Sequence, residues 1–269
     1  MNTISLCLAG SMIEVGRLSP PDPIAYLDRV AASDSGRAYK RQMLAMLDLH
    51  PGQTVLDIGC GPGTDLDDLA AGVTQTGSVI GVDHNPVMAE RARVRLAGQS
   101  IVDVRVGDAH ALPIDDRSVD RARTDRVLQH VADPSQVLAE FCRVARPGAR
   151  IVMAEPDWDT LLIDHDDLTM SRGLNRFIAT EMVRNATIGR SLARLSAQAG
   201  LIVRSVVTTA PVFRDFEMAD QILGLRRNVV RAIDAGYLDR GAERWIEEVG
   251  STPFLAGVMV FLVVAEAPA

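Results

Sequence analysis

The chain has 269 residues, of which 47% are hydrophobic and 23% charged, so it can form one large α/β domain, and disorder is not expected. Its 28 Lys and Arg against 35 Asp and Glu give a net charge of −7, which disfavours a nucleic-acid partner because phosphates would be repelled. The three cysteines, Cys7, Cys60 and Cys142, lie far apart, which disfavours a disulfide framework or a zinc site and fits the reducing cytoplasm.

The beginning of the chain is expected to form an extension followed by helices. Residues 1–20 are predicted to be an N-terminal extension that ends at a cluster of prolines. The segment Ser33–Leu49 has the spacing of an amphipathic helix, and His50-Pro51-Gly52 ends it. The N-terminal helices and the strands that follow are predicted to form one core over residues 21–156.

Short apolar runs alternate with helical patterns in this core. The predicted strands are Thr54–Ile58, Ser78–Val82, Ile101–Val106, Val119–Arg123 and Arg150–Ala154. The predicted helices between them are Thr64–Ala71, Pro86–Ala97 and Ser135–Ala145. Alternation of this kind predicts a parallel sheet with helices on both faces.

The pattern changes after Pro156. Residues 157–187 are polar, acidic and partly helical, and they are predicted to be a lid or insertion. Residues 188–269 are predicted to complete the sheet and to supply helices for a substrate pocket. The elements expected there are a helix over Ile188–Ala199, a strand over Leu201–Thr208, helices within Glu217–Val249 and a buried strand over Phe254–Ala265. The last run is shorter than the ~20 residues of a membrane helix, so no membrane span is expected.

The strongest motif is a glycine loop between the first strand and the first helix of the core. It reads GxGxG from Gly59 to Gly63, so its backbone can bend sharply against a ligand. The dinucleotide fingerprint is GxGxxG, and Asp57 would repel a pyrophosphate but attract a cationic ligand. Asp83 ends the second strand, 20 residues after Gly63, which is the place of an acid that binds ribose hydroxyls.

Five segments, in order, resemble one enzyme family: VLDIGCGPG, VIGVD, GDAHALP, VLQHV and FCRVARPGARIVMAEPDW. Together they resemble class I S-adenosylmethionine-dependent methyltransferases of the ubiquinone/menaquinone-biosynthesis type and their natural-product relatives. The resemblance implies a Rossmann-like, mostly parallel seven-stranded sheet of order 3-2-1-4-5-7-6, with helices on both faces and a helical lid. It also implies methyl transfer from S-adenosylmethionine to a small organic acceptor in secondary metabolism, with S-adenosylhomocysteine as product, no nucleic-acid or membrane partner, and a homodimer as one allowed assembly.

The resemblance also implies which residues hold the cofactor. Asp57, Gly59 and Gly61 would hold the methionine end. Asp83 would bind the ribose, and His84 beside it would also contact the cofactor. The remaining contacts would be Met88 and Ala109 at the adenine ring, Asp108 at its amino group, the Thr124 carbonyl at the ammonium, and Arg41, or else Arg37 or Lys40, at the carboxylate.

The acceptor side is predicted from the residues after the fourth and fifth strands. His130 is predicted to be a general base, since an imidazole can accept a phenol or enol proton near neutral pH. Arg126 departs from the small neutral residue that the family often carries there, and it is predicted to face the substrate or to pair with Asp125. The further acceptor-pocket residues predicted are Asp157, Trp158 and Arg190. No metal is predicted, because the acidic stretch that follows Glu155 matches no defined ion-binding loop.

Three other functions compete with methyl transfer as interpretations of this sequence. Some natural-product cyclases share this fold and bind S-adenosylmethionine only structurally, and they remain the main alternative. A nicotinamide oxidoreductase is disfavoured by the GxGxG spacing. A nucleic-acid base methyltransferase is disfavoured because Thr124-Asp125-Arg126-Val127 replaces the Asn/Asp-Pro-Pro-aromatic motif of that class.

Overall fold

A computed structural model of the chain describes residues 23–251 and 253–269, so the predicted extension 1–20 lies outside the described residues. Two helices, α1 (Pro23–Ala32) and α2 (Asp34–Leu47), precede the sheet. The side chain of Ser33 caps α2 by accepting a hydrogen bond from the Gly36 N–H, at 3.0 Å. Helix α2 confirms the amphipathic helix predicted before the first strand.

The central sheet has the predicted order, with one added strand. It runs β3-β2-β1-β4-β5-β8-β6, with strands β1 to β5 parallel and β8 antiparallel to both of its neighbours. The predicted seventh strand is β8, because a two-residue strand, β7, comes before it and pairs with it. The bounds are β1 Thr54–Ile58, β2 Ser78–Asp83, β3 Val102–Val106, β4 Val119–Asp125, β5 Ala145–Ile163, β6 Ile202–Thr209, β7 Val212–Phe213 and β8 Ala256–Glu266.

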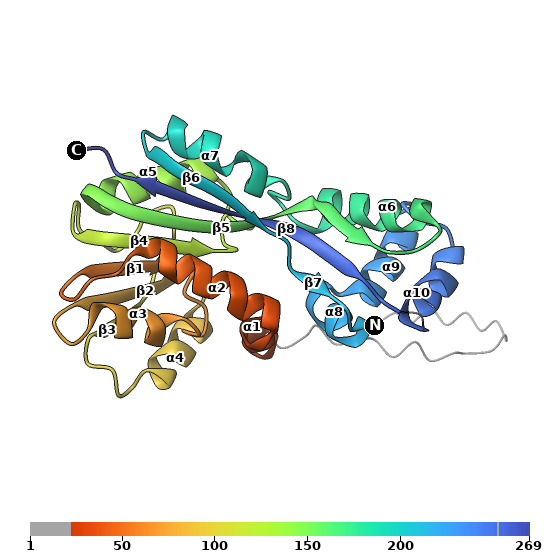
Figure 1. Cartoon of the computed structure of the whole chain (residues 1–269), viewed down its shortest axis with the longest axis horizontal. Helices are drawn as coiled ribbons and strands as arrows, with labels where there is room; N and C mark the ends of the chain where they lie inside the picture. The colour runs from red at the N-terminus through yellow and green to blue at the C-terminus, as the bar shows by residue number, and fades with distance from the viewer. Residues whose placement is uncertain (1–22, 252) are drawn as a thin grey trace, which may run out of the picture.

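Helices cover both faces of this sheet, as predicted (Figure 1). Helices α5 (Pro134–Val144) and α7 (Ile188–Gln198) pack on one face through a core that includes Phe141 and Leu192. Helix α2 packs on the opposite face with α3 (Leu66–Val73) and α4 (Pro86–Arg95), through a core that includes Met43. Because helices cover both faces of the sheet, the carboxyl ends of the parallel strands are the part of the sheet that is open to a ligand.

The fifth strand is longer than predicted and leads into a helical subdomain. Strand β5 continues past the expected end at Ala154 to Ile163, because β8 runs beside it and pairs Ile163 with Ala256. The segment 157–187, predicted as a lid, therefore begins as sheet. The subdomain contains α6 (Leu168–Phe177), a short π-helix (Ile178–Met182), α8 (Phe216–Leu223), α9 (Leu225–Asp234) and α10 (Gly241–Ser251).

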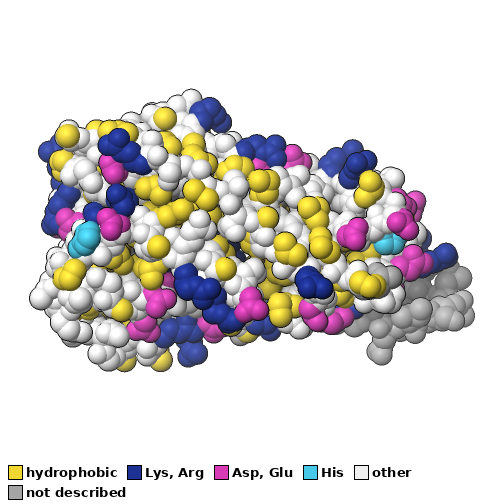
Figure 2. All heavy atoms as spheres, viewed as in Figure 1, with side chains coloured by type: hydrophobic (Ala, Val, Ile, Leu, Met, Phe, Trp, Pro, Cys, Tyr) yellow, Lys and Arg dark blue, Asp and Glu magenta, His cyan; other side chains and the backbone are white. Residues whose placement is uncertain are grey.

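This subdomain has its own hydrophobic core and extends beyond the end of the sheet (Figure 1). Its core includes Phe177, Trp245 and Phe254, packed against the inward-facing Leu161 and Ile163 of the β5 extension. Within the described residues, no helix has the length and apolar character needed to cross a membrane. Figure 2 shows acidic and basic side chains interspersed over the face in view, with apolar side chains among them.

Candidate functional site

A cavity of about 740 Å³ lies at the carboxyl ends of β1 to β4. Open α/β sheets bind ligands at this edge, in the crevice where the strand order reverses. The lining comes from the glycine loop, the ends of β2 and β3, the loop after β4, and helix α1. The lining residues are Tyr26, Leu27, Ile58, Gly59, Gly61, Val82–Asn85, Met88, Val106–His110, Asp125–Val127 and Gln129–Ala132.

The glycine loop needs its glycines for two separate reasons. Gly59, Gly61 and Gly63 have φ values of 72°, 54° and 76°, a left-handed conformation that costs other residues free energy. Contacts also leave no room for side chains. A Cβ at Gly59 would lie 2.2 Å from Cγ2 of Val127. The bend is therefore free of side chains on the cavity side and packs directly against the loop that follows β4.

Asp83 links the glycine loop to the start of α4. Its Oδ2 accepts a hydrogen bond from the Gly61 N–H at 2.8 Å, and its Oδ1 accepts one from the Asn85 N–H at 2.9 Å. The carboxylate is buried yet lines the cavity. Since a carboxylate has about four acceptor positions, Asp83 retains capacity for a ligand diol.

The predicted adenine-side residues meet at the same cavity. His84, Met88, Asp108 and Ala109 all line it, together with Gly59, Gly61 and Asp83. Hydrogen bonds from the backbone and the side chain of His110 lower the pKa of Asp108, so this carboxylate is ionised and restricted in orientation.

The predicted acceptor-side residues His130 and Arg126 also line the cavity. Arg126 has a φ of 58°, its backbone N–H donates to the Ala154 carbonyl at 2.8 Å, and its Nε lies 3.5 Å from Oδ1 of Asp125. Both orientations predicted for Arg126, facing the cavity and pairing with Asp125, are therefore compatible with its place. Partial burial lowers the pKa of His130, and the charges of Arg126 and His84 lower it further.

Six predicted site residues do not line this cavity. Two of them, Asp57 and Thr124, are buried directly beside it, at the ends of β1 and β4. Arg41 is exposed on α2, away from the lining. The other three are Asp157 and Arg190, which form an ion pair with each other, and Trp158, whose Nε1–H donates to Oε1 of Gln129 at 2.7 Å. Trp158 therefore does not line the cavity itself but donates a hydrogen bond to Gln129, which does.

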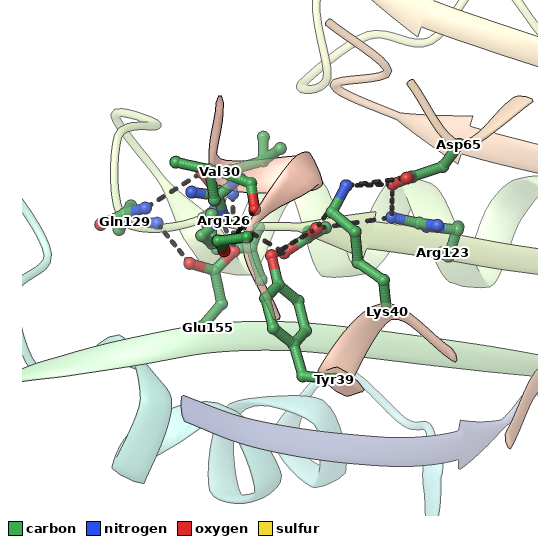
Figure 3. Close-up of polar contacts among 12 residues, drawn as sticks. Val30, Tyr39, Lys40, Asp65, Arg123, Arg126, Gln129 and Glu155 are labelled. Atoms are coloured by element: carbon green, nitrogen blue, oxygen red, sulfur yellow. Dashed lines mark hydrogen bonds and ion pairs between the residues drawn. The ribbon is translucent and has the colours of Figure 1, made fainter. Parts of the chain in front are cut away.

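A buried ion cluster surrounds Asp65, which follows the glycine loop at the start of α3 (Figure 3). Lys40 Nζ lies 2.6 Å from Asp65 and 3.6 Å from Asp125. Arg123 contacts the same two carboxylates, at 2.8 Å and 3.6 Å, and also lies 3.3 Å from Asp57. These charges join α2, β1, β4 and the start of α3. Sequence reasoning named Asp57 and Lys40 singly but missed the cluster, because the pairing of Asp57 with Arg123 depends on the β1–β4 register.

The carboxylates of this cluster differ in pKa. Burial raises the pKa of Asp57 to about 7, and the charge of Arg123 offsets only part of that increase. Burial also acts to raise the pKa of Asp65, but the charges of Arg123 and Lys40 outweigh it and lower the pKa to about 2. Asp65 therefore carries the negative charge that holds Lys40 and Arg123 together.

Sequence reasoning also missed the contribution of α1. Tyr26 and Leu27 line the cavity, and a Cβ at Gly61 would lie 3.3 Å from Cδ1 of Leu27. Helix α1 thus closes over the glycine loop, and no motif in its sequence indicated this. Among the described residues, no group of three or more His, Cys, Asp or Glu side chains could hold a metal ion.

Comparison with known proteins gives the family of this fold and site. A family model for a methyltransferase domain matches residues 49–200. The chain belongs to the class I S-adenosylmethionine-dependent methyltransferases. The methyltransferase is 52% identical over 248 residues to an uncharacterized 37.1 kDa protein in transposon TN4556 of Streptomyces fradiae, covering 92% of this chain and 72% of that one.

Further relatives match over the core alone or by fold alone. A demethylmenaquinone methyltransferase of Shouchella clausii is 33% identical over 137 residues, which is 50% of this methyltransferase and 58% of the relative. A putative methyltransferase of Bacillus halodurans superposes with a TM-score of 0.65 at 16% identity, covering 86% of this chain and 100% of that one. The [4+2]-cyclase SpnF superposes with a TM-score of 0.58 at 17% identity, covering 91% and 93%. At these identities both structures show the fold alone.

Proposed function

We propose that this enzyme transfers the methyl group of S-adenosylmethionine to a small organic acceptor of secondary metabolism, in the cytoplasm. One observation carries the proposal: the glycines of the bend at Gly59–Gly61 and the carboxylates of Asp83 and Asp108 all line one cavity. The bend accommodates a ligand that approaches the backbone closely, and a strand-end carboxylate accepts hydrogen bonds from a ribose diol. The relative named as a demethylmenaquinone methyltransferase favours a small acceptor.

The residues at the cavity fit this cofactor. A Cβ at Gly61 would lie 3.3 Å from Cδ1 of Leu27, so α1 packs closely over the bend at which the amino-acid end is proposed to bind. In the proposal Asp83 receives the ribose hydroxyls, Met88 packs against the adenine ring and Asp108 accepts from its amino group. When bound, S-adenosylmethionine supplies a sulfonium-activated methyl group, so the protein contributes orientation and exclusion of water.

His130 is proposed to accept the acceptor's proton. The pKa of His130 is lowered, so its imidazole is mainly neutral near pH 7 and has a lone pair available. Burial acts to lower the pKa of nearby Arg126, but the neighbouring Tyr39 and Asp125 outweigh burial and raise the pKa, so Arg126 is cationic. A phenol or enol that loses its proton to His130 becomes an anion, which the Arg126 guanidinium would stabilise.

Calorimetry with purified protein tests the proposal. S-adenosylmethionine and S-adenosylhomocysteine should bind at one site per chain, while NADH should show no heat of binding. Incubation with a panel of phenols, enols and quinols should then yield S-adenosylhomocysteine with at least one acceptor. Absence of binding by both sulfur compounds would refute the proposal. Binding without S-adenosylhomocysteine formation from any acceptor would favour the cyclase-like alternative, in which the cofactor is structural.

A further inference from the structure

The loop after β4, residues 126–131, lies on the acceptor side of the cavity. Two side chains that do not line the cavity, Glu155 and Asn185, form hydrogen bonds with the backbone of this loop. Glu155, on β5, is fully buried, and its Oε1 accepts hydrogen bonds from the Val127 and Leu128 N–H groups at 2.8 Å and 2.6 Å. Its Oε2 accepts a third from the Gln129 N–H at 3.3 Å. Figure 3 shows the Glu155 carboxylate pointing from its strand toward this loop.

Asn185, just before α7, holds the opposite side of the loop. Its Nδ2 donates to the Leu128 and Val131 carbonyls, both at 2.8 Å, and its backbone N–H donates to the Gln129 carbonyl at 3.0 Å. The loop thus gives three N–H groups to Glu155 and three carbonyls to Asn185. Buried backbone groups left unpaired would cost free energy, so the two side chains determine one conformation of the loop.

His130 lies inside the segment that these bonds define. Its own N–H donates to the Val127 carbonyl at 2.9 Å, and its neighbours on both sides in sequence are bound by Asn185. The Gln129 side chain donates to the Arg126 carbonyl at 3.1 Å, which extends the constraint to Arg126. The backbone position of both predicted acceptor-side residues therefore depends on Glu155 and Asn185.

We propose that Glu155 and Asn185 are positioning residues, which set the place of His130 and Arg126 against the methyl acceptor without touching it. The proposal rests on the proposed function. Misplacement of a reacting group by about 1 Å can reduce turnover by on the order of 100-fold, so a loop that carries a base needs such support. Neither residue belongs to the cavity lining, and their effect passes through backbone hydrogen bonds only.

The test uses the imidazole of His130 as its reporter and needs no known acceptor. The full chain with labelled histidine is titrated by NMR, and the His130 signal is assigned by its loss in His130→Gln. Glu155→Leu removes the acceptors of all three N–H groups, and Asn185→Leu removes two donors at similar size. In both variants we expect the His130 midpoint to rise toward the ordinary ~6.5, because a loosened loop exposes the ring to water.

Two matched variants serve as controls. Glu140→Leu removes a carboxylate that also accepts a backbone N–H, from Leu112, and Asn175→Leu removes an amide that also donates to two carbonyls, on β5. Both controls should leave the His130 midpoint unchanged. An unchanged His130 midpoint in folded Glu155→Leu and Asn185→Leu would overturn the proposal. If Glu155→Leu fails to fold, Asn185→Leu decides alone.

A second measurement separates this inference from the proposed function. Affinity for S-adenosylhomocysteine is determined by calorimetry for the same variants, and it should stay within about twofold of the parent protein, because most of the proposed cofactor contacts follow β1, β2 and β3. A shifted His130 midpoint with retained affinity supports positioning. A parallel loss of affinity in both variants would indicate general loosening of the site and overturn the inference. Absence of binding in the parent protein would instead refute the proposed function.

Discussion

The carboxylate of Asp28 on α1 lies 2.7 Å from the guanidinium of Arg95 at the end of α4. This ion pair ties the helix that carries Tyr26 and Leu27 to the helix that carries Met88, and these three residues line the cavity. Helix α1 also contacts α2 and α8. Closure of α1 over the glycine loop is therefore secured at its side by a partly exposed charge pair.

Removal of this pair should weaken cofactor binding modestly. Partly exposed ion pairs contribute ~0–1 kcal/mol, so Asp28→Asn should raise the dissociation constant for S-adenosylhomocysteine by up to about fivefold. The effect should shrink at high salt, where the pair is screened. Calorimetry at two salt concentrations measures both. Arg204→Gln, which removes an ion pair with Glu266 on the β6 edge, is the control and should bind as the parent does. Equal affinity of Asp28→Asn and the control would contradict the prediction.

Substitution of Gly59 should affect stability and binding together. Gly59→Ala places a Cβ 2.2 Å from the Val127 side chain at a φ of 72°, which costs ~1–2 kcal/mol for the backbone and more for the clash. Gly148→Ala is the matched control, since Gly148 has a φ of 75° but no described atom lies within 4 Å of the added Cβ. Urea unfolding should show the larger loss for Gly59→Ala, and calorimetry should show lost affinity in that variant alone. A similar loss in both would mean that the contact with Val127 is unimportant.

Asp83→Asn should reduce cofactor affinity at least tenfold. An amide has one acceptor oxygen, so it cannot keep both backbone hydrogen bonds, from Gly61 and Asn85, and also receive a ribose diol. The same change should cost ~1–3 kcal/mol of stability, because one buried donor is left unpaired. Calorimetry with S-adenosylhomocysteine and urea unfolding measure the two effects. Retained affinity in the folded variant would refute the ribose role of Asp83.

Stability should fall as pH rises from about 4 to 7. The pKa of Asp57 is 3.8 in a model peptide and about 7 in the fold, so the folded state holds a proton that the unfolded state has released. Burial likewise raises the pKa of Glu155 from 4.5 to about 8. The free energy of unfolding therefore decreases with pH across this window. Urea unfolding at several pH values should show a flatter dependence for Asp57→Asn, whereas the exposed control Asp68→Asn should keep the parent slope. If Asp57→Asn keeps the pH dependence of the parent protein, Asp57 is ionised throughout this pH range.

His130→Ala should separate turnover from cofactor binding. Loss of a general base typically reduces turnover by ~100–10,000-fold, while S-adenosylhomocysteine affinity should be unchanged. Turnover is measured by S-adenosylhomocysteine formation once an acceptor is found in the panel. If turnover is equal to that of the parent protein, the acceptor needs no base.

The sequence by itself predicted the alternation of strands and helices and the position of the glycine loop, and its resemblance to a known family implied the order of the sheet. Strand β1 was predicted with both its bounds, and the residues after β1, β2 and β3 meet at one cavity, because short-range spacing dictates which residues follow a strand. The length of β5, the closure by α1 and the support of His130 by Glu155 were decided only in the tertiary structure. Each depends on a partner far along the chain, such as β8 beside β5 or the loop before α7, and local periodicity carries no information about long-range pairing.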